Sequence, residues 1–346
     1  MARVTWVTVS NPSPYRDGAY SCCLLGDVVF AVGFDEVMGV GRQRYRVEAR
    51  SVRDGYILGR WTDEKVHRVA SLYSCVATRN RVFAVGATEG FWSVIVFDRE
   101  LAVVRRRDFE KPRFIPYAVD SDGDLLFVAG AELLSTGLYA IHIEAISVDD
   151  LTPIAKHSSN PRERGAAAYT ITFNPETRQV LVGGFDNVDG YRSYRVEVLN
   201  RDLSLAVVAR PGIRGAITGI SPGPQGTSYA VGRGGVVKIS REGSTIMTNT
   251  TRSGIKIAFS AAPPLGGRVA VITDNNLHVL DENLGAVETT RIARGTEVLA
   301  ATQGRVAADA TNIYIAMTQI LTDVDWGWSI IAVNPRPARR FGIFGR

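Results

Sequence analysis

One short apolar segment recurs along the whole chain. Its first copy is Val29-Phe30-Ala31-Val32-Gly33, and six similar segments follow at steps of 53, 44, 54, 48, 41 and 44 residues. The seven copies begin at Val29, Val82, Leu126, Val180, Ser228, Val269 and Ile313. A short, continuous apolar run bounded by polar turns is typical of a buried β-strand, and no helical periodicity of useful length lies beside it. The sequence therefore predicts a repeated all-β unit.

A second apolar run follows most copies and ends in a polar turn, as at Asp98-Arg99-Glu100-Leu101 and Asn200-Arg201-Asp202-Leu203. Asp and Asn side chains bond to their own backbone, which favours a hairpin turn there. Tight turns also precede three copies, at Gly26-Asp27, Asp122-Gly123 and Thr311-Asn312. Each unit is thus predicted to be a meander of four antiparallel strands, A to D, with the repeated segment on strand B.

The middle strands of each unit are apolar throughout and do not alternate. A sheet that is covered on both faces loses the alternation of a half-exposed sheet. Blades of a propeller are covered in this way, because each is sandwiched between two neighbours, and their period is roughly 40–50 residues. We therefore predict a seven-bladed β-propeller of four-stranded antiparallel blades that forms one domain over residues 1–346.

The chain thus resembles the β-propeller superfamily over nearly its whole length. Blades one and four are loosely similar to kelch repeats, through Val32-Gly33-Phe34-Asp35, Gly183-Gly184-Phe185-Asp186 and the later Tyr45 and Tyr194. The doubled glycine occurs once, however, and the late tryptophan of that repeat occurs only as Trp61. The Gly-His and Trp-Asp signatures of WD40 repeats are absent, so no specific family is indicated.

The seventh unit lacks one strand. Strands A to C of this unit can be assigned to Arg305–Ala310, Ile313–Thr318 and Ser329–Val333. Regular pairing then stops at Asn334-Pro335-Arg336-Pro337. A spare strand, Val4–Ser10, exists at the other end of the chain. Because an open ring would expose two sheet edges, we predict that residues 1–10 supply the outer strand of the last blade. Residues 335–346 form a basic C-terminal tail in this interpretation.

Loop lengths distinguish the two rims of the predicted ring. Links from A to B and from C to D share one rim and are short, whereas the links from B to C and from D to the next A share the other rim. Long links on the second rim are Asp35–Arg44, Glu132–Gly137, Asp186–Ser193, Gln319–Trp328, Pro153–Ala168 and Ala293–Gly304. Function concentrates on long loops of a rigid scaffold, so this rim is the predicted binding face.

Three of these loops are rich in the residue types that dominate binding hot spots. The candidate partner-binding residues are Arg42, Arg44, Tyr45, Tyr191, Arg192, Trp326 and Trp328. An alternative interpretation is structural. The tryptophans would then cap the core of the last blade, and the arginines would pair with acids of the loops.

The overall composition is that of a globular protein, with 45% hydrophobic and 22% charged residues. Of the 40 basic residues 35 are arginine, and Cys, Met and Gln are scarce, as in many heat-adapted proteins. A GC-rich genome would give the same bias. The first ten residues do not resemble a signal peptide, and no apolar stretch approaches the roughly 18 residues of a membrane span. With three cysteines, too few for a disulfide framework, we expect a reducing compartment and a cytoplasmic location.

No residue set forms a specific catalytic or cofactor signature. His142 and His278 lie inside apolar runs and are predicted strand residues, whereas His67 and His157 lie in polar links. Cys22 and Cys75 occupy matching places on two first strands, which indicates a small buried residue more than a zinc site. We therefore expect no cofactor and no metal site.

One turn resembles part of a calcium loop. Asp120-Ser121-Asp122-Gly123-Asp124 has carboxylates at alternate positions but lacks the later bidentate glutamate, and a hairpin turn is needed there anyway. The sequence leaves calcium binding open.

Two local clusters of basic residues are compatible with a nucleic-acid partner. They are Arg105-Arg106-Arg107 and the four tail arginines Arg336, Arg339, Arg340 and Arg346. The net charge of +5 is modest for that class of protein, however, and the first cluster fits a charged outer strand.

The sequence favours a non-enzymatic module that binds a protein or peptide through the long-loop face. The alternative is an enzyme, of hydrolase or lyase type, with its site at the channel mouth on the same face. Propellers serve both purposes, so the fold alone does not choose.

Overall fold

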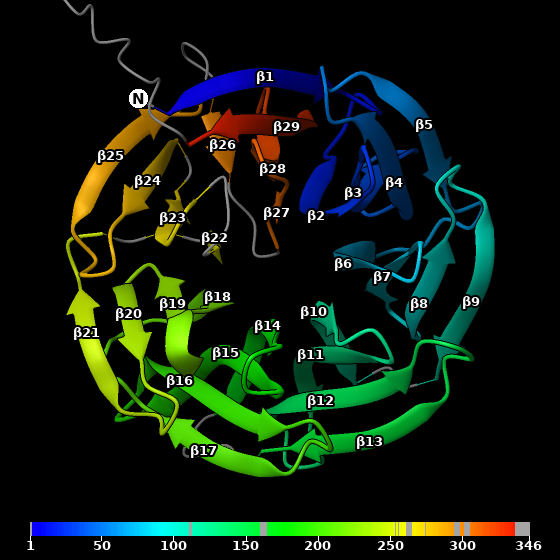
Figure 1. The fold of residues 1–346 in the computed structure, drawn as a ribbon. Coiled ribbons are helices and arrows are strands. Elements are labelled where there is room, and N and C mark those ends of the chain that lie inside the picture. Colours follow the sequence, from blue (N-terminus) through cyan, green and yellow to red (C-terminus); the bar gives the residue numbers. More distant parts are fainter. Residues whose placement is uncertain are drawn as a thin grey trace, which may run out of the picture.

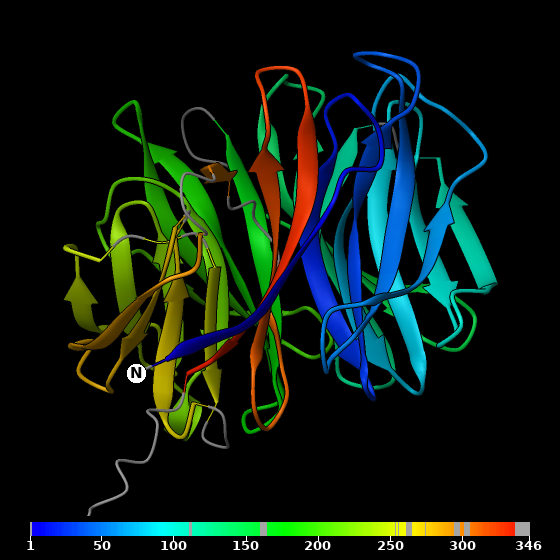
Figure 2. The same cartoon turned by 90° about the horizontal axis from the view of Figure 1, so that it is seen from above.

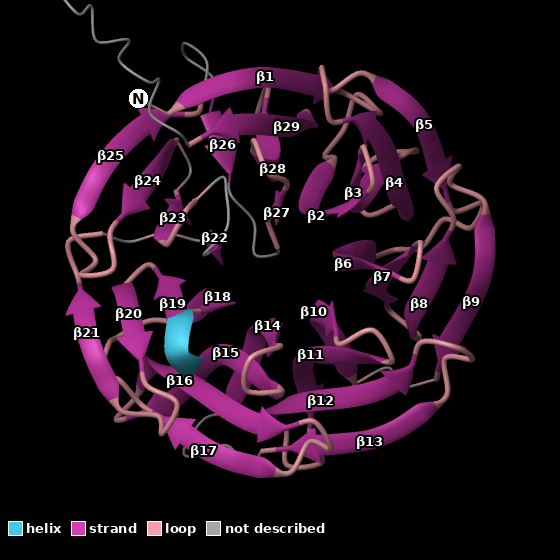
Figure 3. Cartoon of the chain, in the orientation of Figure 1, coloured by secondary structure: helices cyan, strands magenta, loops and turns pink. Residues whose placement is uncertain are grey.

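The computed structural model describes residues 2–110, 113–159, 165–252, 254, 256–260, 265–273, 275–293, 298–300 and 305–335. Seven antiparallel sheets stand around a central channel as the blades of a propeller (Figure 1). Nearly all regular structure is strand (Figure 3), and the helical turn η1 (Pro224–Gly226) has three residues. Within the described ranges, no helix has the length and apolar character needed to cross a membrane. The predicted all-β fold of seven blades is confirmed.

Six blades are meanders of four consecutive strands, ordered from the channel outward. Blades 1 to 3 comprise β2 (Gly18–Leu25), β3 (Val28–Glu36), β4 (Gln43–Ser51), β5 (Ile57–Thr62); β6 (Ala70–Thr78), β7 (Arg81–Thr88), β8 (Trp92–Phe97), β9 (Val103–Phe109); β10 (Phe114–Ser121), β11 (Leu125–Leu133), β12 (Tyr139–Ser147), β13 (Pro153–Ser158). Blades 4 to 6 comprise β14 (Ala166–Asn174), β15 (Gln179–Val188), β16 (Tyr191–Asn200), β17 (Leu205–Ala209); β18 (Ile217–Pro222), β19 (Ser228–Gly232), β20 (Gly235–Ile239), β21 (Thr245–Asn249); β22 (Lys256–Ser260), β23 (Arg268–Ile272), β24 (Asn276–Leu280), β25 (Ala286–Arg291). Blade 7 comprises β26 (Val298–Ala300), β27 (Ala307–Ala308), β28 (Ile313–Ile320), β29 (Trp326–Asn334) and β1 (Arg3–Ser10).

The N-terminal strand closes the ring, as predicted. β1 pairs antiparallel with β29 from Arg3↔Asn334 to Ser10↔Trp328, and so forms the outer strand of blade 7. Its one buried aromatic side chain, Trp6, packs against Tyr314 of the same blade at 5.8 Å between ring centroids. The indole N–H of Trp6 donates to the Val52 carbonyl of blade 1 at 3.0 Å, which joins the two blades across the seam.

Several predicted loops are strands in the structure. Residues 153–158 form β13, so the link from blade 3 to blade 4 is shorter than predicted, and Asp186–Ser193 is a long hairpin that turns at Asp189-Gly190. The predicted inner strand Arg305–Ala310 is also wrong in extent, because β27 is short and β26 pairs with the other half of β28. Most of Ala293–Gly304 and residues 336–346 of the predicted tail lie outside the described residues.

A bulge in the inner strand explains the glycine at the end of the repeated segment. In blades 1 to 5 the pairing of the first two strands shifts by one residue, and the extra residues are Tyr20, Tyr73, Tyr117, Tyr169 and Thr218. The bulge carries a carbonyl oxygen over the neighbouring strand. A Cβ at Gly130 would lie 1.9 Å from the Ile115 oxygen, and one at Gly33 would lie 1.8 Å from the Gly18 oxygen. Only glycine admits this approach.

We expect Gly130→Ala to lower the free energy of unfolding by about 1–3 kcal/mol or more, because the methyl group must push the bulged strand away. Gly90→Ala is the matched control, since a Cβ at Gly90 would meet no atom within 4 Å. Urea unfolding of both variants measures the difference. Equal stabilities would show that the bulge accommodates the methyl group without loss of stability.

Charged side chains form a buried network at the seam between blades 7 and 1. Glu48 of β4 is fully buried and pairs with Arg46 (Nη2–Oε1 2.7 Å) and with Arg50. Two side chains of the closing strand complete it, because Ser10 Oγ donates to Glu48 at 2.6 Å and Arg50 donates to Thr8 Oγ1 at 2.6 Å. Burial alone would raise the pKa of Glu48, but the two guanidiniums outweigh it and hold the pKa below its usual range. The network thus binds the closing strand to blade 1.

Candidate functional site

The two rims of the ring differ in the connections they carry. We call the rim with the B–C and D–A connections the loop face, and the rim with the A–B and C–D turns the turn face. In Figure 2 the loop face is uppermost, and the β28–β29 hairpin stands on it. β1 runs from the turn face to the loop face in the same view.

The structure buries two of the predicted binding residues and pairs a third with an acid. Tyr45 and Trp328 are fully buried, so neither can contact a partner. The indole N–H of Trp328 donates to the Phe34 carbonyl at 3.1 Å, which fixes the side chain in the core between blades 7 and 1. Arg44 is partly exposed but pairs with buried Asp35 at 2.8 Å. The burial of Trp328 and the ion pair of Arg44 are the contacts that the structural alternative predicts.

The other four predicted residues are accessible but lie in two places. Arg42 in the β3–β4 loop is exposed, and half-buried Trp326 at the start of β29 stacks on Arg16, whose guanidinium carbon is 4.8 Å from the ring centroid. Tyr191 and Arg192, both exposed, start β16 on the opposite side of the channel (Figure 1). The structure therefore does not bring the seven residues together.

A row of tyrosines around the channel is the feature that sequence reasoning missed. The bulges of blades 1 to 4 place Tyr20, Tyr73, Tyr117 and Tyr169 side by side, with ring centroids 5.2, 5.4 and 5.2 Å apart. Burial, reinforced by the neighbouring phenol of Tyr20, raises the pKa of Tyr73 to about 12. The row is therefore an uncharged aromatic lining, polar only at its hydroxyl groups.

At the blade 4 end of the row lies a pocket of about 320 Å³ that opens on the loop face, here called the tyrosine pocket. Its lining residues are Ile115, Tyr117, Ala131, Tyr139, Gly165, Ala167, Tyr169, Phe185, Asn187 and Arg192. The Arg192 guanidinium stacks on Phe185, at 4.5 Å from the ring centroid, and lies near the Tyr169 hydroxyl, whose pKa it lowers against the effect of burial. The pocket thus combines aromatic walls with one cation at its rim.

Two surface patches flank the channel mouth on the loop face. The basic patch covers blades 4 to 6 and consists of Arg192, Arg210, Arg214, Arg233 and Arg252. The apolar patch covers blades 7 to 2 and consists of Met38, Val40, Val66, Val69, Leu321 and Val324, each at least 40% exposed. Backbone hydrogen bonds join the loops beneath the apolar patch, such as His67 N to the Gln43 carbonyl at 2.8 Å.

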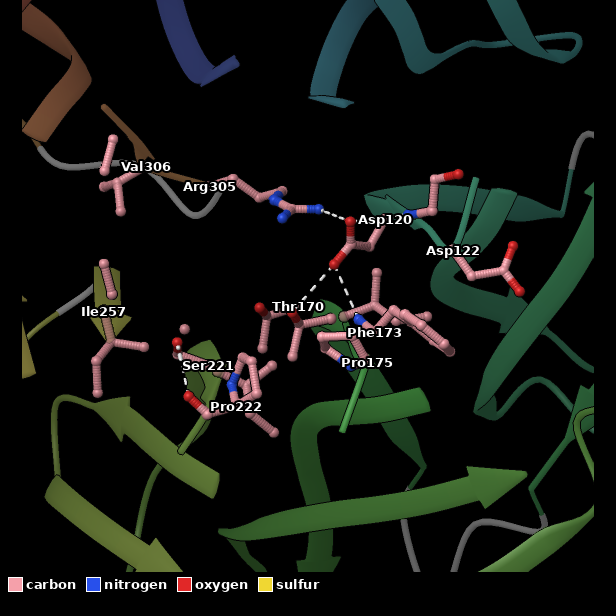
Figure 4. Close-up of a pocket in the computed structure, with 17 residues that line it drawn as sticks. Asp120, Asp122, Thr170, Phe173, Pro175, Ser221, Pro222, Ile257, Arg305 and Val306 are labelled. Atoms are coloured by element: carbon pink, nitrogen blue, oxygen red, sulfur yellow. Dashed lines mark hydrogen bonds and ion pairs between the residues drawn. The ribbon is translucent and has the colours of Figure 1, made fainter. Parts of the chain in front are cut away.

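A larger cavity, about 450 Å³, occupies the channel toward the turn face (Figure 4). Arg305 of blade 7 reaches into it and pairs with Asp120 of blade 3. Asp120 also accepts hydrogen bonds from Thr172 Oγ1 at 3.0 Å and from the Phe173 amide at 2.9 Å. A second cation, fully buried Lys256 of blade 6, donates to the Tyr20 carbonyl of blade 1 at 2.5 Å. Cations from blades 6 and 7 therefore link the inner strands across the ring.

The carboxylates near this cavity are already engaged. Arg201 pairs with Asp122, whose Oδ1 also accepts the Leu125 amide at 2.8 Å. Burial alone would raise the pKa of Asp122, but these contacts hold it below its usual range. Asp124 of the same turn pairs with Arg79 and Arg201. The carboxylates of the Asp120–Asp124 turn thus serve arginines and amides, and no cluster of metal-ligating side chains occurs among the described residues.

Blade 3 contains a contact that superficially resembles a catalytic triad. His142 Nδ1 lies 2.6 Å from Ser158 Oγ, and its Nε2 lies 3.0 Å from Glu144. Glu132 also lies 3.0 Å from Nδ1, so both ring nitrogens face carboxylates. His142 occupies the place in its blade that Arg195 occupies in blade 4, between an acid of strand B and an acid of strand C. We therefore interpret it as a structural bridge on β12, in agreement with the sequence.

The remaining histidines also have structural contacts. His278 lies on β24, as predicted, and burial lowers its pKa. His157 lies on the outer strand β13 rather than in a link, and its ring bonds to buried Glu197 at 3.1 Å. His67, in the β5–β6 link, packs edge-on against Phe91. Cys22 and Cys75 are buried, as expected for small core residues.

The sequence matches no protein-family model and no curated protein. Its structure is similar to the WD40 domain of Neurospora crassa Pan2, with a TM-score of 0.65 and 10% identity over 97% of this chain and 96% of that one. It is also similar to quinohemoprotein alcohol dehydrogenase from Comamonas testosteroni (TM-score 0.61, 10% identity, 98% of this chain and 77% of that one). Chaetomium thermophilum Sqt1 bound to the N-terminus of ribosomal protein L10 matches with a TM-score of 0.54 and 12% identity over 94% of this chain and 100% of that one. These matches support no kelch-like character. At such low identity they establish the β-propeller fold, which this chain shares with WD40 domains.

Proposed function

We propose that this protein is a non-enzymatic interaction module that holds a protein or peptide against its loop face. The observation that carries the proposal is the apolar patch. Several exposed apolar side chains gathered on neighbouring loops of one face mark an interaction site. The described turns of the turn face, by contrast, expose one large apolar side chain, Tyr56.

Two further observations support this function. Arginines engage Asp120 and Asp122 of the channel cavity, and the loop face carries both exposed apolar side chains and arginines. A similar propeller, Sqt1, has been solved with the N-terminus of ribosomal protein L10 bound, so this fold is suited to hold a segment of another protein.

The test is capture of partners from a lysate of the source organism by the immobilised full-length protein. We expect the double variant Val40→Asp, Val324→Asp to reduce recovery of specific partners at least about tenfold, because it places charge in an apolar contact. Val40 and Val324 are exposed, so the variant should fold normally.

The matched control is Ile246→Asp, Val287→Asp, which makes the same changes at exposed positions of the outer strands β21 and β25. The control should capture partners as the wild type does. Equal capture by the loop-face variant and the wild type would refute the proposed function.

A further inference from the structure

We propose that the segment bound on the loop face is acidic, and that it inserts an apolar or aromatic side chain into the tyrosine pocket while a neighbouring carboxylate binds Arg192. This inference rests on the proposed function and adds the chemistry of the partner.

The walls of the tyrosine pocket select the inserted group. Tyr117 and Tyr169 meet edge to face, Phe185 closes one side, and Ala131 and Ala167 are buried beneath them. Tyr139, which is 45% exposed, stands at the opening. A volume of about 320 Å³ lies at the lower end of the range for small-molecule sites, roughly 300–1,000 Å³. The pocket therefore fits one apolar side chain.

The charge at the rim selects what lies beside that side chain. Arg192 is the one charged residue of the lining, and its described contacts are the Phe185 ring and the Tyr169 hydroxyl. A guanidinium has five N–H donors, so these contacts leave donors for a carboxylate. A second pair of an arginine and an aromatic ring is formed by Arg214 and Tyr191, with the guanidinium carbon 4.2 Å from the ring centroid.

Most arginines of the basic patch lack an acidic partner. Arg210 is the exception, because it pairs with buried Asp186 at 3.3 Å. Within the described part of the chain no ion pair with an acid is formed by the other four, which are Arg192, Arg214, Arg233 and Arg252. Their positive charge is therefore available to a partner, and charge complementarity is how such a patch steers and selects one.

The distribution of charge favours a protein segment over a nucleic acid. The half of the loop face around the apolar patch exposes acids and bases in equal number, so it offers a polyanion no continuous basic track. These residues are Glu64, Glu89, Asp323, Arg42, Lys65 and Arg68. Single-stranded nucleic acid also needs open ring faces for base stacking. Here Phe185 is buried under Arg192, and Arg214 occupies one face of the Tyr191 ring.

Fluorescence anisotropy with defined probes tests the inference. The probes are a short labelled peptide in which one phenylalanine is flanked by glutamates, the same peptide with lysines for the glutamates, the same peptide with alanine for phenylalanine, and an oligouridine RNA. We expect the glutamate peptide to bind at least about tenfold more tightly than the other three. Equal binding of the lysine peptide, tighter binding of the RNA, or no binding up to millimolar peptide would overturn the inference.

Charge reversal locates the contact. Arg192→Glu and, separately, Arg214→Glu should weaken binding of the glutamate peptide at least about tenfold. Arg192→Glu should also strengthen binding of the lysine peptide. The control Arg53→Glu makes the same change at an exposed position of the turn face and should alter neither affinity. If Arg192→Glu leaves the peptide affinities unchanged, the pocket is not the site.

Failure of this inference is distinguishable from failure of the proposed function. If Val40→Asp, Val324→Asp abolishes capture from the lysate while Arg192→Glu and Arg214→Glu do not affect it, the loop face binds a partner that is not acidic. If none of these variants alters capture, the loop face is not the interaction surface.

Discussion

Replacing Glu48 with glutamine is expected to lower the free energy of unfolding by about 3–5 kcal/mol, the usual cost of removing one partner from a buried ion pair. Glu48 is fully buried and neutralises both Arg46 and Arg50. Glutamine keeps the shape but leaves buried Arg50 without its anion, and it leaves Arg46 with Asp35 alone, at 3.2 Å. The change also weakens the contact with Ser10, so the loss affects the seam of the ring.

The measurement is the urea midpoint and slope of the variant and of Glu242→Gln, the same change in an exposed turn between β20 and β21. The control should differ from the wild type by less than about 0.5 kcal/mol. A loss below about 1 kcal/mol in Glu48→Gln would mean that the network is hydrated and worth no more than a surface pair.

The same carboxylate predicts a pH dependence. Since the folded protein holds the pKa of Glu48 below its usual range, the charged form contributes stability at every pH above the unfolded value of about 4.3. That contribution is lost as acid protonates Glu48 in the folded protein. The stability difference between the wild type and Glu48→Gln should therefore be constant near neutral pH and shrink below about pH 4. A difference that grows on acidification would contradict this sign.

The fold could be predicted because its signal is repeated. Seven copies of one apolar segment need seven similar environments, and the missing strand of blade 7 has one candidate in residues 1–10. The ends of the strands were harder to predict from the sequence. The hairpin at Asp186–Ser193, for example, continues its strand pairing through polar residues that resemble a loop. Periodicity reports burial, and a strand that projects beyond the core carries no such signal.

The candidate site was predicted only in part. Arg, Tyr and Trp are common both at interfaces and in cores, so the sequence did not separate buried Tyr45 and Trp328 from exposed Tyr191. The tyrosine row did have a signal. Tyr20, Tyr73 and Tyr117 each precede the glycine of the repeated segment by 13 residues. Burial of that row depends on bulges, which a single sequence does not reveal.

Removal of residues 1–10 is expected to have the largest effect of all, because it takes away a whole strand. β1 covers the edge of β29 along its length and supplies Trp6. Loss of a buried tryptophan side chain alone costs about 3–5 kcal/mol. The shortened protein should melt at a much lower temperature and should aggregate, since the uncovered edge of β29 can pair with another chain.

Thermal unfolding and gel filtration measure these effects, and a peptide of residues 2–11 added in trans provides the decisive control. If β1 acts by pairing with β29, this peptide should restore the monomer and raise the melting temperature with its concentration, because binding to the folded state adds stability by mass action. A scrambled peptide should do neither.

Within the intact chain, Trp6→Ala should reproduce part of the loss of stability, whereas Val9→Ser, at a partly exposed position of the same strand, should not. Unchanged melting of the shortened protein would mean that the ring is held closed by contacts between the inner strands of blades 7 and 1 and needs no outer strand.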